Sequence, residues 1–366
     1  MNLVQKSELE RIVKQAGHDV GFDLCGIAPA ADSRELEYFP KWIAAGHAGE
    51  MKYMEARDER GDLKRGCLAR VAPWARSVIV CAINYNTEQP YSAQIYDPDR
   101  GWISRYAWSR EDYHDAVLRR LQQLEEVLQN EPWSGGRPRP PDLTTRCYVD
   151  TGPIVERVFA KYAGVGWIGK NTCIINQKKG SWLFLGVILT SLELVPDLAA
   201  PDRCGTCTRC IEACPTDAIL APYQLDSNRC ISYLTIEKRG SIPEELRAGM
   251  GRHIFGCDIC QDVCPWNRKA PASTAPEFQP RPGLVNPALA WLAEMSEEQF
   301  REQFRGSPIR RTKRSGLRRN VAIAMGNSGN AKFAPLLESM ANDADEHVAE
   351  SARWALRKLQ DHQANS

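Results

Sequence analysis

Cysteines gather in two runs of this sequence, and the first run has the spacing of thiolates that hold iron–sulfur clusters. It reads C-G-T-C-T-R-C-I-E-A-C-P from Cys204 to Pro215, which is the pattern C-x2-C-x2-C-x3-C-P. In this pattern three thiolates bind one cubane cluster and the fourth binds a second cluster. The run therefore predicts a second set of ligands elsewhere in the chain.

The second run matches the last three positions of the same pattern. Cys257, Cys260 and Cys264 form C-x2-C-x3-C-P with Pro265, and Cys230 is the nearby candidate for the missing position. We therefore predict two [4Fe–4S] clusters. The first is expected on Cys204, Cys207, Cys210 and Cys264, and the second on Cys257, Cys260, Cys230 and Cys214.

Zinc and disulfide bonds are the rival uses of such cysteines. Paired C-x2-C units also build tetrahedral zinc sites. Zinc does not require a third thiolate at the same spacing followed by C-P, so the pattern favours iron–sulfur chemistry. A chain of 366 residues can bury a core without covalent crosslinks, which disfavours a disulfide framework.

Composition places the chain among ordinary globular proteins. Its 47 Lys and Arg nearly balance its 46 Asp and Glu, and the length predicts two or three domains. Thirteen cysteines indicate a reducing compartment. The first ten residues lack the apolar segment of a signal peptide, and the most apolar stretch, Trp182–Leu189, is too short to span a bilayer. We expect a cytoplasmic protein without a membrane partner.

Helices and strands are expected to interleave before Pro196. Periodicity predicts helices over residues 3–16, 118–128 and 154–163, the last with Pro153 at its first position. Apolar runs predict strands over residues 22–28, 78–85, 146–149 and 182–194, and residues 132–141 are expected to form a surface loop. This alternation predicts an α/β or α+β domain that is large enough for an organic cofactor.

Two segments resemble known motifs incompletely. Gly164–Asn171 reads G-V-G-W-I-G-K-N, one residue short of the phosphate-binding G-x-x-x-x-G-K-[ST], with the helix and strand in the wrong order. We expect a turn there, or a backbone platform close to a flat ligand. Asp112-Tyr113-His114 begins like the D-x-H-x-x-G signature of cobalt ligation, but Val117 replaces the glycine, so a helix start is expected.

Asp150 is a candidate acid at the end of a predicted strand, in C-Y-V-D-T-G-P. It can serve the N-terminus of the helix that follows, which favours negative charge. It can also donate a proton in a reaction. Burial against an apolar cofactor would raise the pKa of Asp150 for that role, whereas the helix dipole would lower it. The sequence leaves both roles open.

The last hundred residues combine helical patterns with a basic stretch. No acidic residue occurs between Glu302 and Glu338, and basic residues gather there at Arg305, Arg310, Arg311, Lys313, Arg314, Arg318, Arg319 and Lys332. Such a patch favours a nucleic-acid backbone as partner, the alternative being a solvated helix face. Segments 320–326, 332–340 and 347–359 are typical of paired helices in a HEAT-type repeat.

Several longer segments together resemble the epoxyqueuosine reductase family, which acts in the last step of queuosine biosynthesis in tRNA. They are S-R-Y-A-W-S-R-E-D-Y-H, D-T-G-P-I-V-E-R, G-W-I-G-K-N, both cysteine runs with C-I-S-Y-L-T-I-E-K-R-G between them, and G-S-P-I-R-R-T-K-R-S-G-L-R-R-N. The resemblance covers nearly the whole chain and includes Arg57.

The resemblance implies an α+β multidomain fold. Residues 1–195 would form an α/β cobalamin-binding catalytic domain, residues 196–275 a ferredoxin-like domain with two [4Fe–4S] clusters, and residues 276–366 a helical HEAT-like region that binds tRNA. Base-off cobalamin would lie near Arg57, Ala107, Asp150, Ile174, Leu185 and Ser232. Phosphates of tRNA would contact Lys238, Arg310, Arg311, Lys313, Arg314, Arg318 and Arg319.

By the same resemblance, a monomer would reduce epoxyqueuosine to queuosine at the wobble position of tRNA. Electrons from an external donor would pass through the clusters to cobalamin, with Asp150 as proton donor. A dehalogenase-like corrinoid and iron–sulfur reductase of a small molecule is an alternative, but it gives the basic region no role. A ferredoxin-type electron carrier is another, and it leaves the first 195 residues without a purpose.

Overall fold

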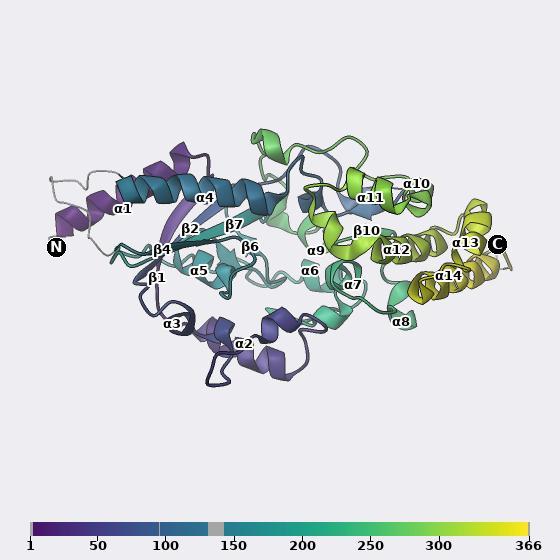
Figure 1. Ribbon diagram of the computed structural model, residues 1–366, viewed down its shortest axis with the longest axis horizontal. Coiled ribbons are helices and arrows are strands. Elements are labelled where there is room, and N and C mark those ends of the chain that lie inside the picture. The colour runs from purple at the N-terminus through teal and green to yellow at the C-terminus, as the bar shows by residue number, and fades with distance from the viewer. Residues whose placement is uncertain (1–2, 95, 131–142, 365–366) are drawn as a thin grey trace. The chain divides into compact units, whose positions relative to one another are not determined.

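The computed structural model describes residues 3–94, 96–130 and 143–364, and the chain forms two compact units (Figure 1). The first unit comprises Met1–Asn86, Tyr113–Cys207 and Pro265–Ala275, and the second comprises Thr87–Asp112, Thr208–Cys264 and Pro276–Ser366. Each unit is therefore built from segments that are distant in the sequence. The surface loop expected over residues 132–141 lies outside the described residues.

A four-stranded antiparallel sheet organises the first unit. Its order is β1 (Leu24–Pro29), β2 (Ser77–Asn84), β7 (Leu183–Thr190) and β4 (Thr145–Tyr148). Every residue of β2 is buried, which explains why this strand reads as a continuous apolar run rather than an alternating one. The four strands predicted from the sequence are confirmed, with ends that differ by up to four residues.

Helices cover both faces of this sheet (Figure 1). On one face lie α1 (Leu3–Asp19) and α4 (Tyr113–Asn130), and on the other lies α5 (Glu156–Tyr162). Gly186 lets α4 approach β7 closely, because a Cβ at this position would meet Val117 and Leu121 at 2.9 Å. On the α5 face, Val80 and Val187 pack with Val158 and Phe159 in one apolar cluster. Two further helices of this unit are α2 (Arg34–Ala44) and α3 (Leu68–Val71).

The start of α5 corrects one prediction. The helix begins at Glu156, so Pro153 precedes it and is not its first residue. Asp150 has a φ of 57°, and the Thr151 amide donates a hydrogen bond of 2.6 Å to the Val149 carbonyl. These local bends keep the chain out of the helix until Val155, the N-cap.

The glycine-rich segment forms a turn, as predicted, inside a small hairpin. Strands β5 (Trp167–Ile168) and β6 (Ile174–Ile175) pair antiparallel on either side of it. A glycine is required at Gly166, because a Cβ there would lie 2.5 Å from the Ile175 carbonyl oxygen. The motif therefore gives this segment a tight turn and not a strand-to-helix phosphate loop.

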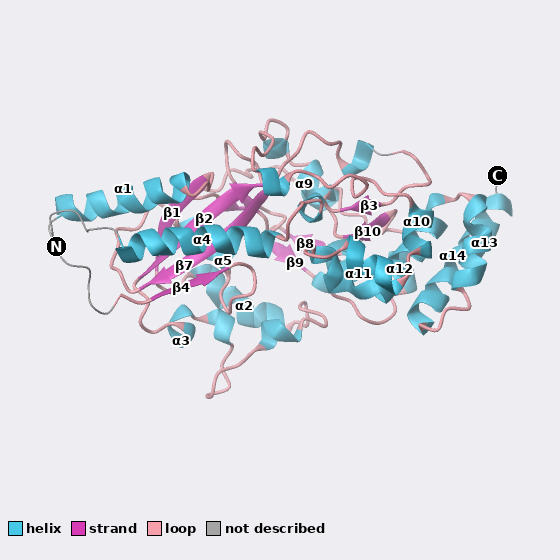
Figure 2. Cartoon of the chain, turned by 45° about the horizontal axis from the view of Figure 1, so that its top comes forward, coloured by secondary structure: helices cyan, strands magenta, loops and turns pink. Residues whose placement is uncertain are grey.

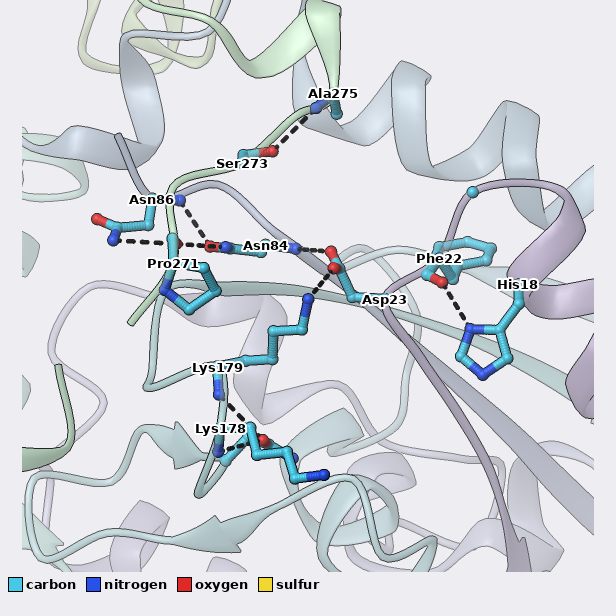
Figure 3. Close-up of polar contacts among 12 residues, drawn as sticks. His18, Phe22, Asp23, Asn84, Asn86, Lys178, Lys179, Pro271, Ser273 and Ala275 are labelled. Atoms are coloured by element: carbon cyan, nitrogen blue, oxygen red, sulfur yellow. Dashed lines mark hydrogen bonds and ion pairs between the residues drawn. The ribbon is translucent and has the colours of Figure 1, made fainter. Parts of the chain in front are cut away.

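The segment after the second cysteine run is fastened to the sheet of the first unit (Figure 3). Asp23 accepts a hydrogen bond from the Asn84 amide at 2.8 Å and pairs with Lys179 at 2.5 Å. The side chains of Asn84 and Asn86 then donate to the carbonyl of Pro271 at 2.7 and 3.2 Å. Two asparagines at the end of β2 thus fix residues 270 and 271 by their backbone.

Short elements form the part of the second unit around the cysteines. Strand β3 (Trp102–Ile103) pairs parallel with β10 (His253–Phe255), and β8 (Ile219–Ala221) pairs antiparallel with β9 (Gln224–Leu225). The helices here are α6 (Arg209–Glu212), α7 (Ile231–Ile236), α8 (Glu244–Arg247) and α9 (Ile259–Asp262). Helices of one or two turns depend on tertiary packing for stability.

Five helices complete the second unit (Figure 2). They are α10 (Leu289–Glu294), α11 (Glu297–Gln303), α12 (Lys313–Ser328), α13 (Ala334–Met340) and α14 (Glu346–Ala364). All residues from Asn320 to Met325 are buried, so the middle of α12 is enclosed on every side. It contacts α14 closely at Gly326, where a Cβ would lie 2.8 Å from Ala355. The helices predicted in this region are confirmed. Within the described ranges, none of the helices combines the length and hydropathy needed to cross a membrane.

Candidate functional site

Two short helices in the second unit carry equivalent parts of the two cysteine runs. Cys210 lies in α6 and Cys260 in α9, and these helices pack against each other. Cys214 follows Cys210, and Cys264 follows Cys260, by about one helical turn. The C-x3-C-P halves of both runs therefore adopt matching local structures.

Two of the other ligands predicted for the second cluster, Cys230 and Cys214, lie near Cys257. Burial raises the pKa of the Cys257 thiol well above its ordinary value, and the nearby Cys230 and Cys214 raise it further. The Ala218 amide donates to the Cys214 sulfur at 3.3 Å, and the Ile259 amide donates to Cys257. Buried sulfurs that receive N–H hydrogen bonds fit thiolates bound to iron, because the positive metal offsets their charge. The donor set therefore fits an iron–sulfur cluster.

The ligands predicted for the first cluster are divided between the units. Cys204 and Cys207 belong to the first unit, and Cys210 and Cys264 to the second. In the ranges that the structure describes, no three His, Cys, Asp or Glu side chains are grouped as around a single metal ion. A [4Fe–4S] cluster needs no such group, because each of its thiolates binds a different iron.

A buried aspartate ties the second cysteine run to the rest of its unit. Asp258, next to Cys257, accepts hydrogen bonds from the Trp102 indole at 3.1 Å and the Arg105 amide at 2.7 Å. The Ser104 hydroxyl donates to the same carboxylate. Burial raises the pKa of Asp258, and these hydrogen bonds act against that rise. Segment 102–105 thereby fixes the backbone beside a cluster ligand.

Asp150 lies in the first unit, beside the start of α4. Its carboxylate accepts a hydrogen bond of 2.9 Å from the Tyr113 hydroxyl, and the His114 Nε2 lies 3.6 Å from the same oxygen. The Tyr113 ring stacks on Phe184 with a centroid distance of 4.4 Å and an angle of 2°. Burial alone would raise the pKa of Asp150, but the nearby His114 ring and the hydrogen bond from Tyr113 outweigh it and lower the pKa to about 2. Asp150 is therefore ionised at neutral pH, although 59% of its side chain is exposed.

Glu156 is a second carboxyl of this region, and it behaves in the opposite way. Burial raises its pKa to about 7, and the charge of Asp150 contributes to that rise. One oxygen, Oε1, is buried without a hydrogen-bond partner among the described residues. Arg65 lies close enough to lower this pKa in part, and it donates to the Ile154 carbonyl at 2.9 Å. Near pH 7 Glu156 is therefore about half protonated, whereas Asp150 is ionised.

The residues expected to bind cobalamin are found in both units. Asp150, Arg57, Ile174 and Leu185 belong to the first. Ile174 is buried in the apolar cluster of the α5 face and Leu185 packs against it while remaining partly open. Arg57 is exposed and bonds within its own loop, to the Gly61 carbonyl at 2.6 Å.

The other two expected cobalamin contacts belong to the second unit. Ala107 is fully buried in a 3₁₀ turn, and Ser232 is half-buried in α7. In the first unit, the partly buried Leu185 offers an apolar contact, and the Glu156 oxygen without a hydrogen-bond partner among the described residues offers a polar one. Both kinds of group suit a large flat ligand with polar groups at its edge, as a corrin is, so their chemistry fits the expected cofactor.

The basic segment divides into exposed and internal side chains. Arg319 is 1% exposed and donates to the carbonyls of Leu234, Lys238 and Gly240. Arg318 pairs with Asp343 and donates to the Ala293 carbonyl, and Arg314 donates to the Met295 carbonyl. In contrast, Arg310, Arg311 and Lys313 are exposed, Arg311 in an ion pair with Glu237, while Lys238 is half-buried. Part of the predicted contact set thus holds the fold together.

The sequence reasoning missed the partners of Asp150. It interpreted Tyr113 and His114 as a helix start, which α4 confirms, but it did not place them against Asp150. Glu156 was not singled out, because a Glu in the first turn of a helix is common. Only the fold reveals that the start of α4 and the end of β4 meet.

Two family models match the chain. The model of the 4Fe-4S double cluster binding domain matches residues 203–267, and the model described as Epoxyqueuosine reductase QueG, DUF1730 matches residues 65–151. Among curated proteins, the epoxyqueuosine reductase of Pseudomonas aeruginosa is 40% identical over 357 residues, covering 96% of this chain and 95% of the relative. That of Escherichia coli K12 is 38% identical over 96% of this chain and 89% of the relative.

Solved structures agree in fold. An epoxyqueuosine reductase crystallised with a tRNA-Tyr epoxyqueuosine-modified stem loop aligns with a TM-score of 0.85 and 29% identity, covering 97% of this chain and 91% of that one. The Bacillus subtilis enzyme, described with its catalytic aspartate loop swung out of the active site, aligns with a TM-score of 0.83 and 28% identity over 97% and 91%.

A mixed α/β unit with a two-cluster cysteine module defines an iron–sulfur oxidoreductase. The relatives specify which one, because their similarity extends over almost the whole chain. The chain belongs to the epoxyqueuosine reductase family.

Proposed function

We propose that this enzyme reduces epoxyqueuosine to queuosine at the wobble position of tRNA, with Asp150 as the proton donor. The observation that carries the proposal is Asp150 itself, an open carboxylate with a tyrosine and a histidine on the same oxygen. A relative crystallised with an epoxyqueuosine-modified stem loop supports the substrate.

The chemistry gives Asp150 and His114 distinct tasks. When a C–O bond of the epoxide breaks, negative charge develops on oxygen, and a neighbouring acid stabilises it by donating a proton. Asp150 is ionised in the free enzyme, so a proton has to reach it first. Substrate that covers the exposed carboxylate removes water and raises the pKa of Asp150. His114, 3.6 Å away, is the neighbour that can pass it a proton.

The Tyr113 hydroxyl holds the carboxylate in place meanwhile. Its ring is clamped between His114 and Phe184, with centroid distances of 4.0 and 4.4 Å, so the hydroxyl has little freedom to move. A fixed donor orients the acid toward the substrate without a cost at the moment of reaction.

Two [4Fe–4S] clusters and cobalamin are the cofactors we assign. Arg57, Ala107, Asp150, Ile174, Leu185 and Ser232 would hold cobalamin. The chemistry that a bound cobalamin supplies is a strongly reducing cobalt centre, and the clusters are the route for electrons from an external donor. The chain's own cysteines provide the ligands of both clusters.

The helical C-terminal region, which we interpret as HEAT-like, would contact the tRNA backbone. Lys238 and the exposed Arg310, Arg311 and Lys313 are suited to phosphates, whereas the internal Arg314, Arg318 and Arg319 would support that surface from behind. We assign the protein to the cytoplasm, as a monomer, with a catalytic domain over residues 1–195, a cluster domain over 196–275 and a tRNA-binding region over 276–366.

Turnover tests the proposal directly. Anaerobically reconstituted enzyme is incubated with epoxyqueuosine-tRNA and a reductant, with and without cobalamin, and queuosine is measured in the nucleoside digest. We expect product only with cobalamin, and a loss of at least a hundredfold in Asp150→Ala, on the order of a general acid's contribution. Asp115→Ala, which removes an exposed carboxylate from α4, is the matched control. Undiminished product in Asp150→Ala would contradict the proposed role of Asp150 as proton donor. No product from the wild type would contradict the proposed reaction.

A further inference from the structure

The turn between β5 and β6 is built to hold one side chain, Lys170, in a fixed place. The Gly169 amide donates to the Cys173 carbonyl and the Thr172 amide to the Gly169 carbonyl, both at 2.8 Å. Thr172 has a φ of 66°, in the left-handed region. A Cβ on Gly169 would lie 2.5 Å from the side chain of Ile175 and 2.8 Å from that of Asn171, so a larger residue there would displace both side chains. The two backbone hydrogen bonds close this turn tightly.

Lys170 bonds to the loop that carries the first two cysteines. Its ammonium donates to the Gly205 carbonyl at 2.7 Å and to the Cys207 carbonyl at 3.0 Å. Gly205 lies between Cys204 and Cys207, and its φ is 52°. Lys170 forms no ion pair with any residue in the described part of the chain, so no carboxylate neutralises its charge. A half-buried positive charge thus lies on the backbone of the loop that carries two expected cluster ligands, Cys204 and Cys207.

The same hairpin also contacts the chain next to another ligand of that cluster. The rings of Trp167 in β5 and Trp266 pack edge to face, with centroids 5.0 Å apart and an angle of 78°. Trp266 follows Cys264 by two residues. The Ser181 amide, farther along the same sheet connection, donates to Asn267 at 2.7 Å. One hairpin therefore contacts both of the segments, around Cys207 and after Cys264, that lead to the first cluster.

Charge near a cluster changes its reduction potential. A cluster gains one negative charge when it is reduced, so a nearby positive charge stabilises the reduced form and raises the potential. Hydrogen bonds that order the ligand loop also decide whether a cluster assembles. Lys170 is placed to do both.

We propose that Lys170 is a positioning residue, which fixes the Cys204–Cys207 loop and raises the reduction potential of the first cluster. This inference rests on the cluster ligands assigned in the proposed function, and it needs neither the tRNA nor cobalamin. The inference explains the G-W-I-G-K-N segment, which does not form a phosphate-binding loop. Its glycines shape the turn, and its lysine contacts the loop that carries Cys204 and Cys207.

The test compares the full chain with three variants after anaerobic reconstitution. Lys170→Gln keeps a hydrogen-bond donor and removes the charge, and Lys170→Arg keeps both. Lys178→Gln removes an equally charged but exposed lysine of the same unit. Iron per chain is measured chemically, and the midpoint of each cluster is measured by a redox titration followed by electron paramagnetic resonance.

We expect Lys170→Gln to retain both clusters and to shift one midpoint to a more negative potential. At a fixed potential the ratio of reduced to oxidised first cluster should fall about tenfold, which is 59 mV for one electron. The other midpoint should stay unchanged, as should both midpoints in Lys178→Gln, and Lys170→Arg should restore the wild-type value.

Full iron with two unshifted midpoints in Lys170→Gln would overturn the inference. If that variant binds too little iron to titrate, Lys170→Arg decides: full iron with the wild-type midpoint supports the inference, and loss of iron there overturns it. The proposed function fails separately. If Lys170→Gln shows the midpoint shift but the wild type never converts epoxyqueuosine-tRNA, the role of Lys170 is supported and the proposed substrate is contradicted.

Discussion

One carboxylate oxygen of Asp150 lies close to both Tyr113 and His114, and this arrangement affects the pKa of Asp150. Two donors on one carboxylate explain a pKa of about 2, since each stabilises the charged form. Such an acid is a poor proton donor as it stands, and a good one only after its surroundings change. The low pKa therefore marks the state before substrate binds, in which the carboxylate is held ready and charged.

Removing the tyrosine hydroxyl should change the pH dependence of the reaction. Tyr113→Phe keeps the ring on Phe184 but takes one donor from Asp150, so the pKa of Asp150 rises. Under the proposed role the protonated acid is the active form, so the rate should fall as pH rises above its pKa. We expect this falling limb to move to higher pH by about 0.5 to 1 unit, the worth of one hydrogen bond.

Single-turnover rates from pH 5 to 9 would measure this shift. Tyr91→Phe, which removes a hydroxyl from the second unit, serves as the control. A profile that keeps its position in Tyr113→Phe would show that the hydroxyl does not act on the acid.

Glu156 makes a prediction about stability. Its pKa rises on folding from 4.5 to about 7, mainly through burial, so the folded chain binds this proton more tightly than the unfolded chain. The stability it contributes is complete below pH 4.5 and is lost as pH rises through about 7. That span corresponds to roughly 3 kcal/mol, at about 1.4 kcal/mol for each pH unit.

Glu156→Gln should therefore match the wild type near pH 5 and exceed it in thermal stability at pH 8. Thermal unfolding of the reconstituted chain at both values measures the difference, and Glu126→Gln on the exposed face of α4 should be neutral at both. Equal melting at pH 8 would show that Glu156 is not protonated when folded at neutral pH.

In the basic segment, residues of the same charge occupy different environments. Arg319 lies on the buried side of α12 and Lys313 is exposed at its first residue, although both belong to one sequence run. Lys313 also has a φ of 60° and a ψ of 165°, a conformation that lysine rarely adopts. Burial, and not charge, therefore separates Arg319, which bonds inside the fold, from Lys313, for which we propose a phosphate contact.

Two substitutions in this segment should have separate effects. Arg319→Met leaves three buried carbonyls without their donor, and we expect a loss of about 3 kcal/mol or more in unfolding free energy. Lys313→Ala should leave stability unchanged and weaken tRNA binding, lowering the slope of log K against log salt by about 0.7 to 0.9.

Melting curves and binding at several salt concentrations give both results, with Lys178→Ala as the control for binding. If Lys313→Ala binds tRNA with the wild-type salt slope, this lysine does not contact a phosphate. If Arg319→Met has the melting temperature of the wild type, the internal hydrogen bonds of Arg319 do not contribute the expected unfolding free energy.

Elements with long patterns were predictable from the sequence, and short ones were not. The run V-I-V-C-A-I-N predicted β2, and helical periodicity predicted α4, α12 and α14, because each buries a whole apolar face. Strands β5 and β6 have two residues each, and their pairing depends on a turn that the sequence presented as a failed phosphate loop. The start of α5 was placed two residues early because proline is common at N1 and the bend at Asp150 left no sign in the sequence.

At the scale of the whole molecule, the cysteine spacing predicted a two-cluster module. The sequence did not predict that segments are exchanged between the two units. Residues 87–112 lie in the chain between two segments of the first unit but fold into the second unit, where Asp258 accepts hydrogen bonds from Trp102 and Arg105. Residues 265–275 fold into the first unit, where Asn84 and Asn86 hold them. Local composition does not reveal which unit a loop will join, because these anchors are single polar side chains distant in sequence.

With the proposed ligand assignment, the two clusters depend on different parts of the chain, which cysteine substitutions can test. Cys230 and Cys257 lie together in the second unit, whereas Cys264 is the last residue before the chain enters the first unit. A hydroxyl is a poor ligand for iron, so Cys230→Ser should lose the second cluster and Cys264→Ser the first. Iron should fall from about eight atoms per chain to about four in each variant.

The spectra of the two variants decide whether the pairing is right. Each should keep one electron paramagnetic resonance signal, the two signals should differ, and together they should reproduce the wild type. Cys67→Ser, outside both runs, should keep all the iron. The same remaining signal in both variants would mean that Cys230 and Cys264 serve one cluster. Bound zinc without an iron–sulfur signal in the wild type would overturn the cluster assignment, since the C-x2-C spacing would then have built tetrahedral sites.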